Sequence, residues 1–94
     1  MIRVIIERKV ASAMELAFHQ ATKRARIGAI AMDGYLGGET LRDVENHHHY
    51  IIISTWKSLG HWHQWLDSEE RQQLDMELLP CLEEPESFTV TELV

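Results

Sequence analysis

Three tryptophans lie close together in the sequence and form the group of side chains best suited to ligand binding. They are Trp56, Trp62 and Trp65. An indole ring offers a broad apolar face, so several of them can enclose a flat aromatic molecule in a pocket with few polar groups. Ile52 and Phe18 are the further candidates for such a pocket. The alternative is that the tryptophans only fill the hydrophobic core, which is where large aromatic residues usually lie.

Two residues near these tryptophans suit proton transfer or hydrogen bonding to a bound molecule. His63 has a side chain whose pKa suits a general base near neutral pH. Tyr50 can donate a hydrogen bond to a ketone oxygen. Each has a structural alternative: His63 as a solvent-facing helix residue, and Tyr50 as a core tyrosine with a satisfied hydroxyl. His63 and Tyr50 are therefore the candidate catalytic residues.

The histidine-rich segment does not predict a metal site. His47, His48 and His49 are consecutive at the start of an expected strand, so neighbours point to opposite faces. His61 and His63 lie two apart on an expected helix and cannot chelate one ion together. No cysteine or carboxylate spacing completes a zinc or iron site, and no glycine-rich nucleotide-binding motif or nucleophile motif is present. We expect no metal and no cofactor.

Composition limits the class of protein further. The chain has 94 residues and a formal net charge of -6, which disfavours nucleic acid and anionic membranes as partners. It contains one cysteine, Cys81, so we expect a reduced, cytoplasmic protein. No apolar run is long enough to span a membrane. Residues 1–94 are expected to form a single domain.

The elements that position these residues follow from hydrophobic periodicity. Alternation predicts strands over 2–10, 29–43, 48–56 and 87–94, the second of them interrupted by glycines. A capping box at Ser12 and Glu15 and a stop at Gly28 predict a helix over 12–27. Serines 58 and 68 cap a second helical stretch that ends before Pro80, with Leu59, Leu66, Leu74 and Leu79 among its expected inward residues. The order β-α-β-β-α-β predicts an α+β, ferredoxin-like fold: a four-stranded antiparallel sheet with two helices on one face.

The strand at 48–56 also predicts pairing of two chains. Ile52 and Trp56 lie on one face, whereas Ile51 and Ile53 lie on the other, and both faces are apolar. Two helices cover only one face of such a sheet. The other face is therefore expected to meet the same sheet of a second copy, giving a homodimer.

Three segments together resemble the antibiotic biosynthesis monooxygenase domain family. They are Gly34-Tyr-Leu-Gly-Gly-Glu-Thr-Leu-Arg-Asp43, Ile51-Ile-Ile-Ser-Thr-Trp-Lys-Ser58, and Trp62 followed by Trp65-Leu-Asp-Ser68. The resemblance implies a dimeric α+β barrel. It also implies a reaction without cofactor, in which a reduced aromatic is deprotonated and reacts with O2 directly, with Trp56 and Trp62 lining the pocket.

The chain departs from the family pattern at three positions. Haem-degrading members carry a histidine ligand where this chain has Asp75, and a first-strand asparagine where this chain has Glu7 or Arg8. Haem degradation is therefore not expected. Ile52 occupies the place of a polar amide in the anthrone oxidases, which leaves the proton acceptor unassigned. Two functions stay open: a cofactor-independent monooxygenase acting on a quinol or anthrone, and a non-catalytic dimeric binding or regulatory module of the same fold.

Overall fold

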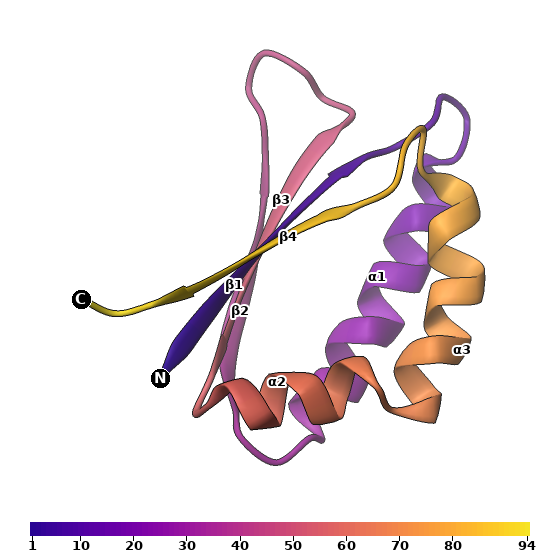
Figure 1. Cartoon of the computed structure of the whole chain (residues 1–94). Coiled ribbons are helices and arrows are strands. Elements are labelled where there is room, and N and C mark those ends of the chain that lie inside the picture. The colour runs from indigo at the N-terminus through magenta and orange to yellow at the C-terminus, as the bar shows by residue number, and fades with distance from the viewer.

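The computed structural model describes all residues of the chain, 1–94, as a sheet with helices packed on one face (Figure 1). Its elements are β1 (Ile2–Lys9), α1 (Glu15–Ile30), β2 (Tyr35–Arg42), β3 (His49–Trp56), α2 (Leu59–Leu66), α3 (Glu69–Leu78), a 3-10 turn (Leu79–Cys81) and β4 (Ser87–Glu92). The sheet order is β2-β3-β1-β4, and every neighbouring pair is antiparallel. The predicted ferredoxin-like α+β fold is confirmed, with the second helical stretch divided into α2 and α3.

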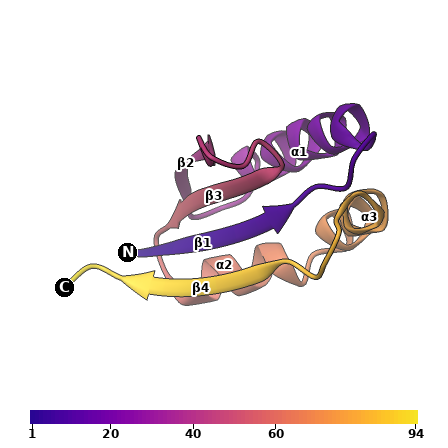
Figure 2. The same ribbon diagram turned by 90° about the horizontal axis from the view of Figure 1, so that it is seen from above.

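Alternation along β1 decides which side chains reach the helices. Val4, Ile6 and Arg8 are buried on the helical side, whereas Arg3 and Glu7 are exposed on the other. Because β1 pairs antiparallel with β4, the beginning of β1 and the end of β4 lie side by side (Figure 2). The inner face of the sheet is thus one wall of the space that the helices close.

Serine caps start the two C-terminal helices as predicted. Ser58 Oγ accepts a hydrogen bond from the backbone N–H of His61 at 3.3 Å, and Ser68 Oγ accepts one from Arg71 at 3.1 Å. Each hydroxyl satisfies one of the N–H groups that a helix start leaves without a partner. Between the caps the chain changes direction, so α2 lies across the end of the sheet while α3 runs alongside α1 (Figure 1).

The predicted bounds of the first helix were wrong at both ends. Ser12 does not cap it; the chain turns at Ala13, whose φ is 69°, and the helix begins at Glu15. Gly28 does not stop it either, and the helix continues to Ile30. Gly28 is buried inside the helix because another side chain packs against its backbone. The left-handed glycine that follows is Gly34, with φ of 85°.

Two hydrophobic clusters fill the space between sheet and helices. One is built around the three tryptophans, with Val4, Ile6, Ala29 and Leu74. The other comprises Val10, Phe18, Ala21, Tyr50, Leu78 and Cys81. Leu59 and Leu79, expected inside, are 46% and 45% exposed. Leu59 is the first residue of α2, and the 3-10 turn at Pro80 directs Leu79 outward.

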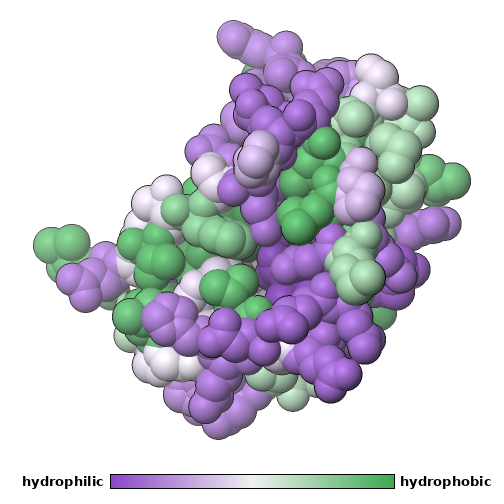
Figure 3. Space-filling model, turned by 45° about the vertical axis from the view of Figure 1, so that its right-hand side comes forward, coloured by the Kyte–Doolittle hydropathy of each residue, from purple (hydrophilic) through white to green (hydrophobic).

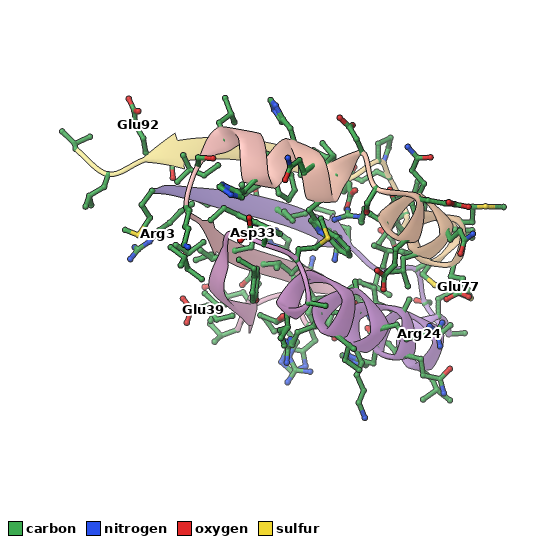
Figure 4. All side chains as sticks on the ribbon, turned by 90° about the horizontal axis from the view of Figure 1, so that it is seen from below. Arg3, Arg24, Asp33, Glu39, Glu77 and Glu92 are labelled. Carbon is green, nitrogen blue, oxygen red and sulfur yellow. The ribbon has the colours of Figure 1, made fainter.

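An exposed ion pair joins the two long helices. Arg24 of α1 and Glu77 of α3 point toward each other and form a salt bridge at the surface (Figure 4). On the helical side of the molecule, hydrophobic residues lie among hydrophilic ones (Figure 3). No helix has the length and apolar character that crossing a membrane requires.

Candidate ligand cavity

A cavity of about 60 Å³ lies between the inner face of the sheet and the helices. Its apolar wall comes from every layer around it: Ile6, Ile52 and Trp56 from the sheet, Ala25 and Ala29 from α1, and Trp62 and Trp65 from α2. Tyr35, Arg26, Glu39 and Thr40, which are half-buried or exposed, lie where the cavity opens between α1 and β2. The fold therefore encloses an apolar space that is reached from the β2 edge.

The aromatic rings at this cavity hold one another in place. Trp56 and Trp62 have ring centroids 6.1 Å apart, and Tyr35 stands edge-on to Trp56 at 5.2 Å. The indole N–H of Trp56 donates to Ser54 Oγ at 3.2 Å. Because this N–H already has a partner, Trp56 offers a ligand its apolar ring.

Two buried arginines form the polar part of the cavity wall. Arg8 of β1 and Arg71 of α3 are 4% and 3% exposed. Arg8 Nε donates to Glu86 Oε2 at 2.7 Å, and Arg71 Nη2 donates to Glu86 Oε1 at 3.3 Å. Arg71 Nε also donates to Asp75 Oδ1 at 2.9 Å. Burial lowers the pKa of Arg8, while the Glu86 carboxylate acts in the opposite direction.

The structure divides the candidate residues named from the sequence into two groups. Trp56, Trp62, Trp65 and Ile52 line the cavity together. Tyr50 and Phe18 lie in the second cluster, with ring centroids 4.8 Å apart, and neither lines the cavity. His63 is exposed on α2 and does not line it either.

The hydroxyl of Tyr50 has partners of its own away from the cavity. It donates to Glu15 Oε2 at 2.8 Å and lies 3.4 Å from His19 Nε2. Burial and the bond to Glu15 raise the pKa of Tyr50, so it stays protonated at neutral pH. The hydrogen bond between Tyr50 and Glu15 thus connects β3 to the start of α1.

The histidine run contacts carboxylates from α1, from β1 and from the β2–β3 loop itself. His48 Nδ1 lies 2.8 Å from Glu15 Oε1. The two ring nitrogens of His49 lie 3.1 Å from Asp43 Oδ2 and 3.1 Å from Glu7 Oε1. These contacts fasten the β2–β3 loop to α1 and β1, at the end of the sheet opposite Trp56.

Sequence reasoning missed the arginines of the cavity, although a signal for each was present. Arg8 continues the even-numbered buried positions of β1 after Val4 and Ile6. Arg71 precedes Leu74 and Leu78 at helical spacing and shares their buried face. A charged residue at a buried position of an amphipathic element is rare enough to mark a possible site.

The chain is similar to proteins of the same fold at low sequence identity. A conserved protein from Methanosarcina mazei Go1 superimposes with a TM-score of 0.89 at 19% identity, covering 95% of this chain and 88% of the other. SnoaB, a cofactor-independent oxygenase from Streptomyces nogalater, superimposes in variant form with a TM-score of 0.88 at 13% identity, covering 98% and 91%.

A curated relative and a family model match the sequence itself. The relative is the 42.8 kDa protein in the whiE locus of Streptomyces coelicolor. The two sequences are 24% identical over 87 residues, and the aligned segment covers 93% of this chain and 22% of the longer protein. The chain thus spans about a fifth of that relative's length. The family model for antibiotic biosynthesis monooxygenases matches residues 1–75. With most of its length matched by that model, the chain belongs to the antibiotic biosynthesis monooxygenase family.

Proposed function

We propose that the protein is a cofactor-independent monooxygenase that oxidises a reduced aromatic of the quinol or anthrone type in the cavity. The observation that carries this proposal is the convergence of Trp56, Trp62 and Trp65 on one cavity, where isoleucine and alanine side chains add to the apolar wall. Such a wall binds a flat ring and keeps water away from a reactive carbanion. Family membership and the fold shared with SnoaB, an oxygenase described as cofactor-independent, support the same reaction.

The proposed reaction balances without a reductant other than the substrate. An anthrone loses a proton from its methylene carbon, and a quinol loses one from a hydroxyl group; in each case the resulting electron-rich anion reduces O2. With an anthrone, one oxygen atom becomes a carbonyl on that carbon and the other leaves as water with the two hydrogens that the carbon held. With a quinol, one oxygen atom becomes a hydroxyl group on a ring carbon of the quinone product, and the other leaves as water with two hydrogens of the quinol. The role of the cavity is to hold the ring against Trp56 and Ile52 and to favour its ionised form.

Cavity volume bears on the size of the substrate. The space of about 60 Å³ is well below the roughly 300–1,000 Å³ of pockets that enclose drug-sized ligands. A bound molecule must also occupy the open mouth beside Tyr35 and Thr40. This favours one-ring quinols over three-ring anthrones.

The proposed assembly is a homodimer with the outer faces of two sheets in contact. Ile5, Ile51 and Ile53 are on that face and are only half-buried within one chain. Two sheets that meet there would cover them, as the dimeric barrel of the family requires. A single buried cysteine, Cys81, is consistent with the cytoplasmic location proposed for this dimer.

A second function, a binding module without chemistry, is favoured by one specific observation. The polar residues of the inner cavity wall are Arg8, Arg71, Ser54 and Thr22. Histidine, the commonest general base near neutral pH, is not among the residues lining it, and the one carboxylate in the lining, Glu39, is exposed on β2. A pocket of this composition suits recognition of an aromatic molecule even if no proton is transferred by the protein.

Oxygen uptake distinguishes the two functions. Metal-stripped protein is given a panel of one-ring quinols and anthrones, with boiled protein measuring autoxidation. Trp56→Phe keeps an aromatic ring but changes the cavity wall, whereas Tyr50→Phe changes a buried aromatic of the same strand outside the cavity. Uptake above autoxidation that falls at least about tenfold in Trp56→Phe and persists in Tyr50→Phe supports the oxygenase. Uptake equal to that of boiled protein across the panel, with ligand binding retained, supports the binding module.

A further inference from the structure

Arg8 brings a positive charge with spare hydrogen-bond donors to the apolar cavity. Its side chain is 4% exposed and lines the cavity beside Ile6. Within the chain its guanidinium donates one hydrogen bond, from Nε to Glu86. The two Nη groups, which carry four N–H bonds, are left for another acceptor. These Nη groups are not sealed from open space, and they can donate hydrogen bonds to an oxygen atom that reaches them.

The charges that balance the arginines lie outside the cavity wall. Arg8 and Arg71 line the cavity, whereas neither Glu86 nor Asp75 does. Both oxygens of Glu86 already accept hydrogen bonds, one from each arginine. The network as a whole is neutral, two guanidinium groups with two carboxylates, but a molecule in the cavity faces its cationic side. The lining also contains one exposed residue of each sign, Arg26 and Glu39. In the apolar interior the potential of the arginines is screened less than in bulk water.

A third polar group at the cavity has no partner at all. Thr22 Oγ1 is buried, lines the cavity from α1 and makes no hydrogen bond within the chain. A hydroxyl can donate to an anionic oxygen or accept from a neutral one. The cavity therefore offers donors from β1 and α1 beside its aromatic wall.

We propose that the cavity selects aromatic ligands carrying an anionic oxygen, a phenolate or a carboxylate, which the Nη groups of Arg8 bind while the ring packs on Trp56. This inference rests on the proposed ligand pocket and adds the chemical class of its occupant. For a quinol, binding of the ionised form lowers the pKa of the bound hydroxyl. The protein then favours the anion through Arg8, and the phenolic proton is released to solvent.

Matched chromogenic ligands test the proposal on the purified full-length chain. Binding of 4-nitrophenol is compared with binding of 4-nitroanisole, which has the same ring but cannot ionise. A second pair, 4-nitrobenzoate and 4-nitrobenzamide, separates a carboxylate from a phenolate as the preferred group. Absorbance of the phenolate reports the pKa of bound 4-nitrophenol. We expect this pKa to fall by about one unit or more on binding, which corresponds to about tenfold tighter binding of the anion.

Two variants assign the effect to Arg8. The double variant Arg8→Gln/Glu86→Gln removes a cation and its carboxylate together, so that no buried charge is left alone. Arg24→Gln is the matched control, because Arg24 lies on α1, pairs with Glu77 at the surface and does not line the cavity. We expect the anion preference to fall to about threefold or less in the double variant and to persist in Arg24→Gln.

Three results of these binding experiments would contradict different parts of the proposal. If 4-nitroanisole binds as tightly as 4-nitrophenol and no bound pKa falls, the pocket stands and the role of Arg8 is wrong. If the double variant keeps the full anion preference, Arg8 is likewise not the group responsible. If none of the four ligands binds and Trp56→Phe changes nothing, the cavity is not a ligand site, and the proposed function fails with the inference.

Discussion

Gly28 of α1 lies directly against the indole of Trp65 in α2 and the side chain of Glu70 in α3: a Cβ atom at Gly28 would be 2.9 Å from Cη2 of Trp65 and 2.8 Å from Oε1 of Glu70. No real Cβ atom sits so close to a neighbouring heavy atom. The absence of a side chain lets the end of α1 approach α2 above the cavity that Trp65 lines. A side chain at this position would have to displace Trp65 or Glu70.

Substitution of this glycine should destabilise the fold despite improving helix propensity. Alanine in a helix gains about 1 kcal/mol over glycine, but overpacking a buried site costs about 1–3 kcal/mol. We expect Gly28→Ala to lower the free energy of unfolding by about 1 kcal/mol, because the buried Trp65 has little room to move. Urea denaturation followed by tryptophan fluorescence measures the change.

Gly60 provides the matched control within α2. A Cβ atom there would have only Ser58 Oγ nearby, at 3.6 Å, which is ordinary contact. Gly60→Ala should therefore stabilise the protein by up to about 1 kcal/mol. If Gly28→Ala were as stabilising as Gly60→Ala, the close packing of Gly28 against Trp65 would be refuted.

Glu86 should be among the most sensitive charged residues of the chain. Its carboxylate accepts hydrogen bonds from Arg8 and Arg71, and all three side chains are buried. Glu86→Gln leaves two buried guanidinium groups with one carboxylate, that of Asp75. Removing one partner of a buried charge network lowers the free energy of unfolding by about 3–5 kcal/mol. The midpoint of urea denaturation should fall accordingly.

An exposed ion pair between α1 and α3 serves as the comparison for Glu86. Glu77 pairs with Arg24 at the surface, where both side chains are about half exposed. Glu77→Gln should change the free energy of unfolding by less than about 1 kcal/mol. Equal effects of Glu77→Gln and Glu86→Gln would show that burial of the network contributes little.

Stability should decline in acid partly through Glu15. Burial alone would raise the pKa of Glu15, but hydrogen bonds from Tyr50 and His48 outweigh it and hold the pKa below its ordinary value of 4.5. A carboxyl with a lowered pKa in the folded state stabilises the protein above its unfolded pKa. That contribution is lost as the pH falls below about 4.5 through the folded pKa.

Comparison with Glu15→Gln isolates this contribution. The difference in urea midpoint between the natural chain and Glu15→Gln should be constant near about pH 6 and shrink toward about pH 3. Glu45→Gln, at an exposed residue whose side chain makes no hydrogen bond, should give a small difference at every pH. A pH-independent difference for Glu15→Gln would contradict the stated pKa shift.

Association of two chains should depend on the outer face of the sheet. Ile5 lies on that face of β1, opposite Ile53 of β3. Light scattering should give twice the chain mass of 10.9 kDa, and Ile5→Glu should give the single mass because it places a charge in the proposed interface. Leu16→Glu, on α1 and 72% exposed, should leave the dimer intact. A monomeric natural chain would remove the basis of the dimer.

Local sequence was sufficient where one short segment determines its own conformation. The alternation of 2–10 and 48–56 predicted the strands that the structure has at Ile2–Lys9 and His49–Trp56, and Ser58 and Ser68 predicted two helix starts. The same local rules failed at Gly28. A glycine often marks a helix end because it can adopt backbone conformations that other residues rarely adopt. Gly28 lies inside the helix instead, where Trp65, a residue 37 positions later in the chain, packs against it.

The candidate site shows the same division. The sequence by itself determined the order of the elements and identified the tryptophans that line the cavity. This was possible because the spacing of large apolar residues shows which face of a strand or helix is buried. Only the tertiary structure placed Tyr50 and Phe18 in a separate cluster and brought Arg8, Arg71 and Glu86 together. The physical reason is that charge pairing and cavity walls depend on contacts between distant segments, which chain packing creates and residue periodicity does not encode.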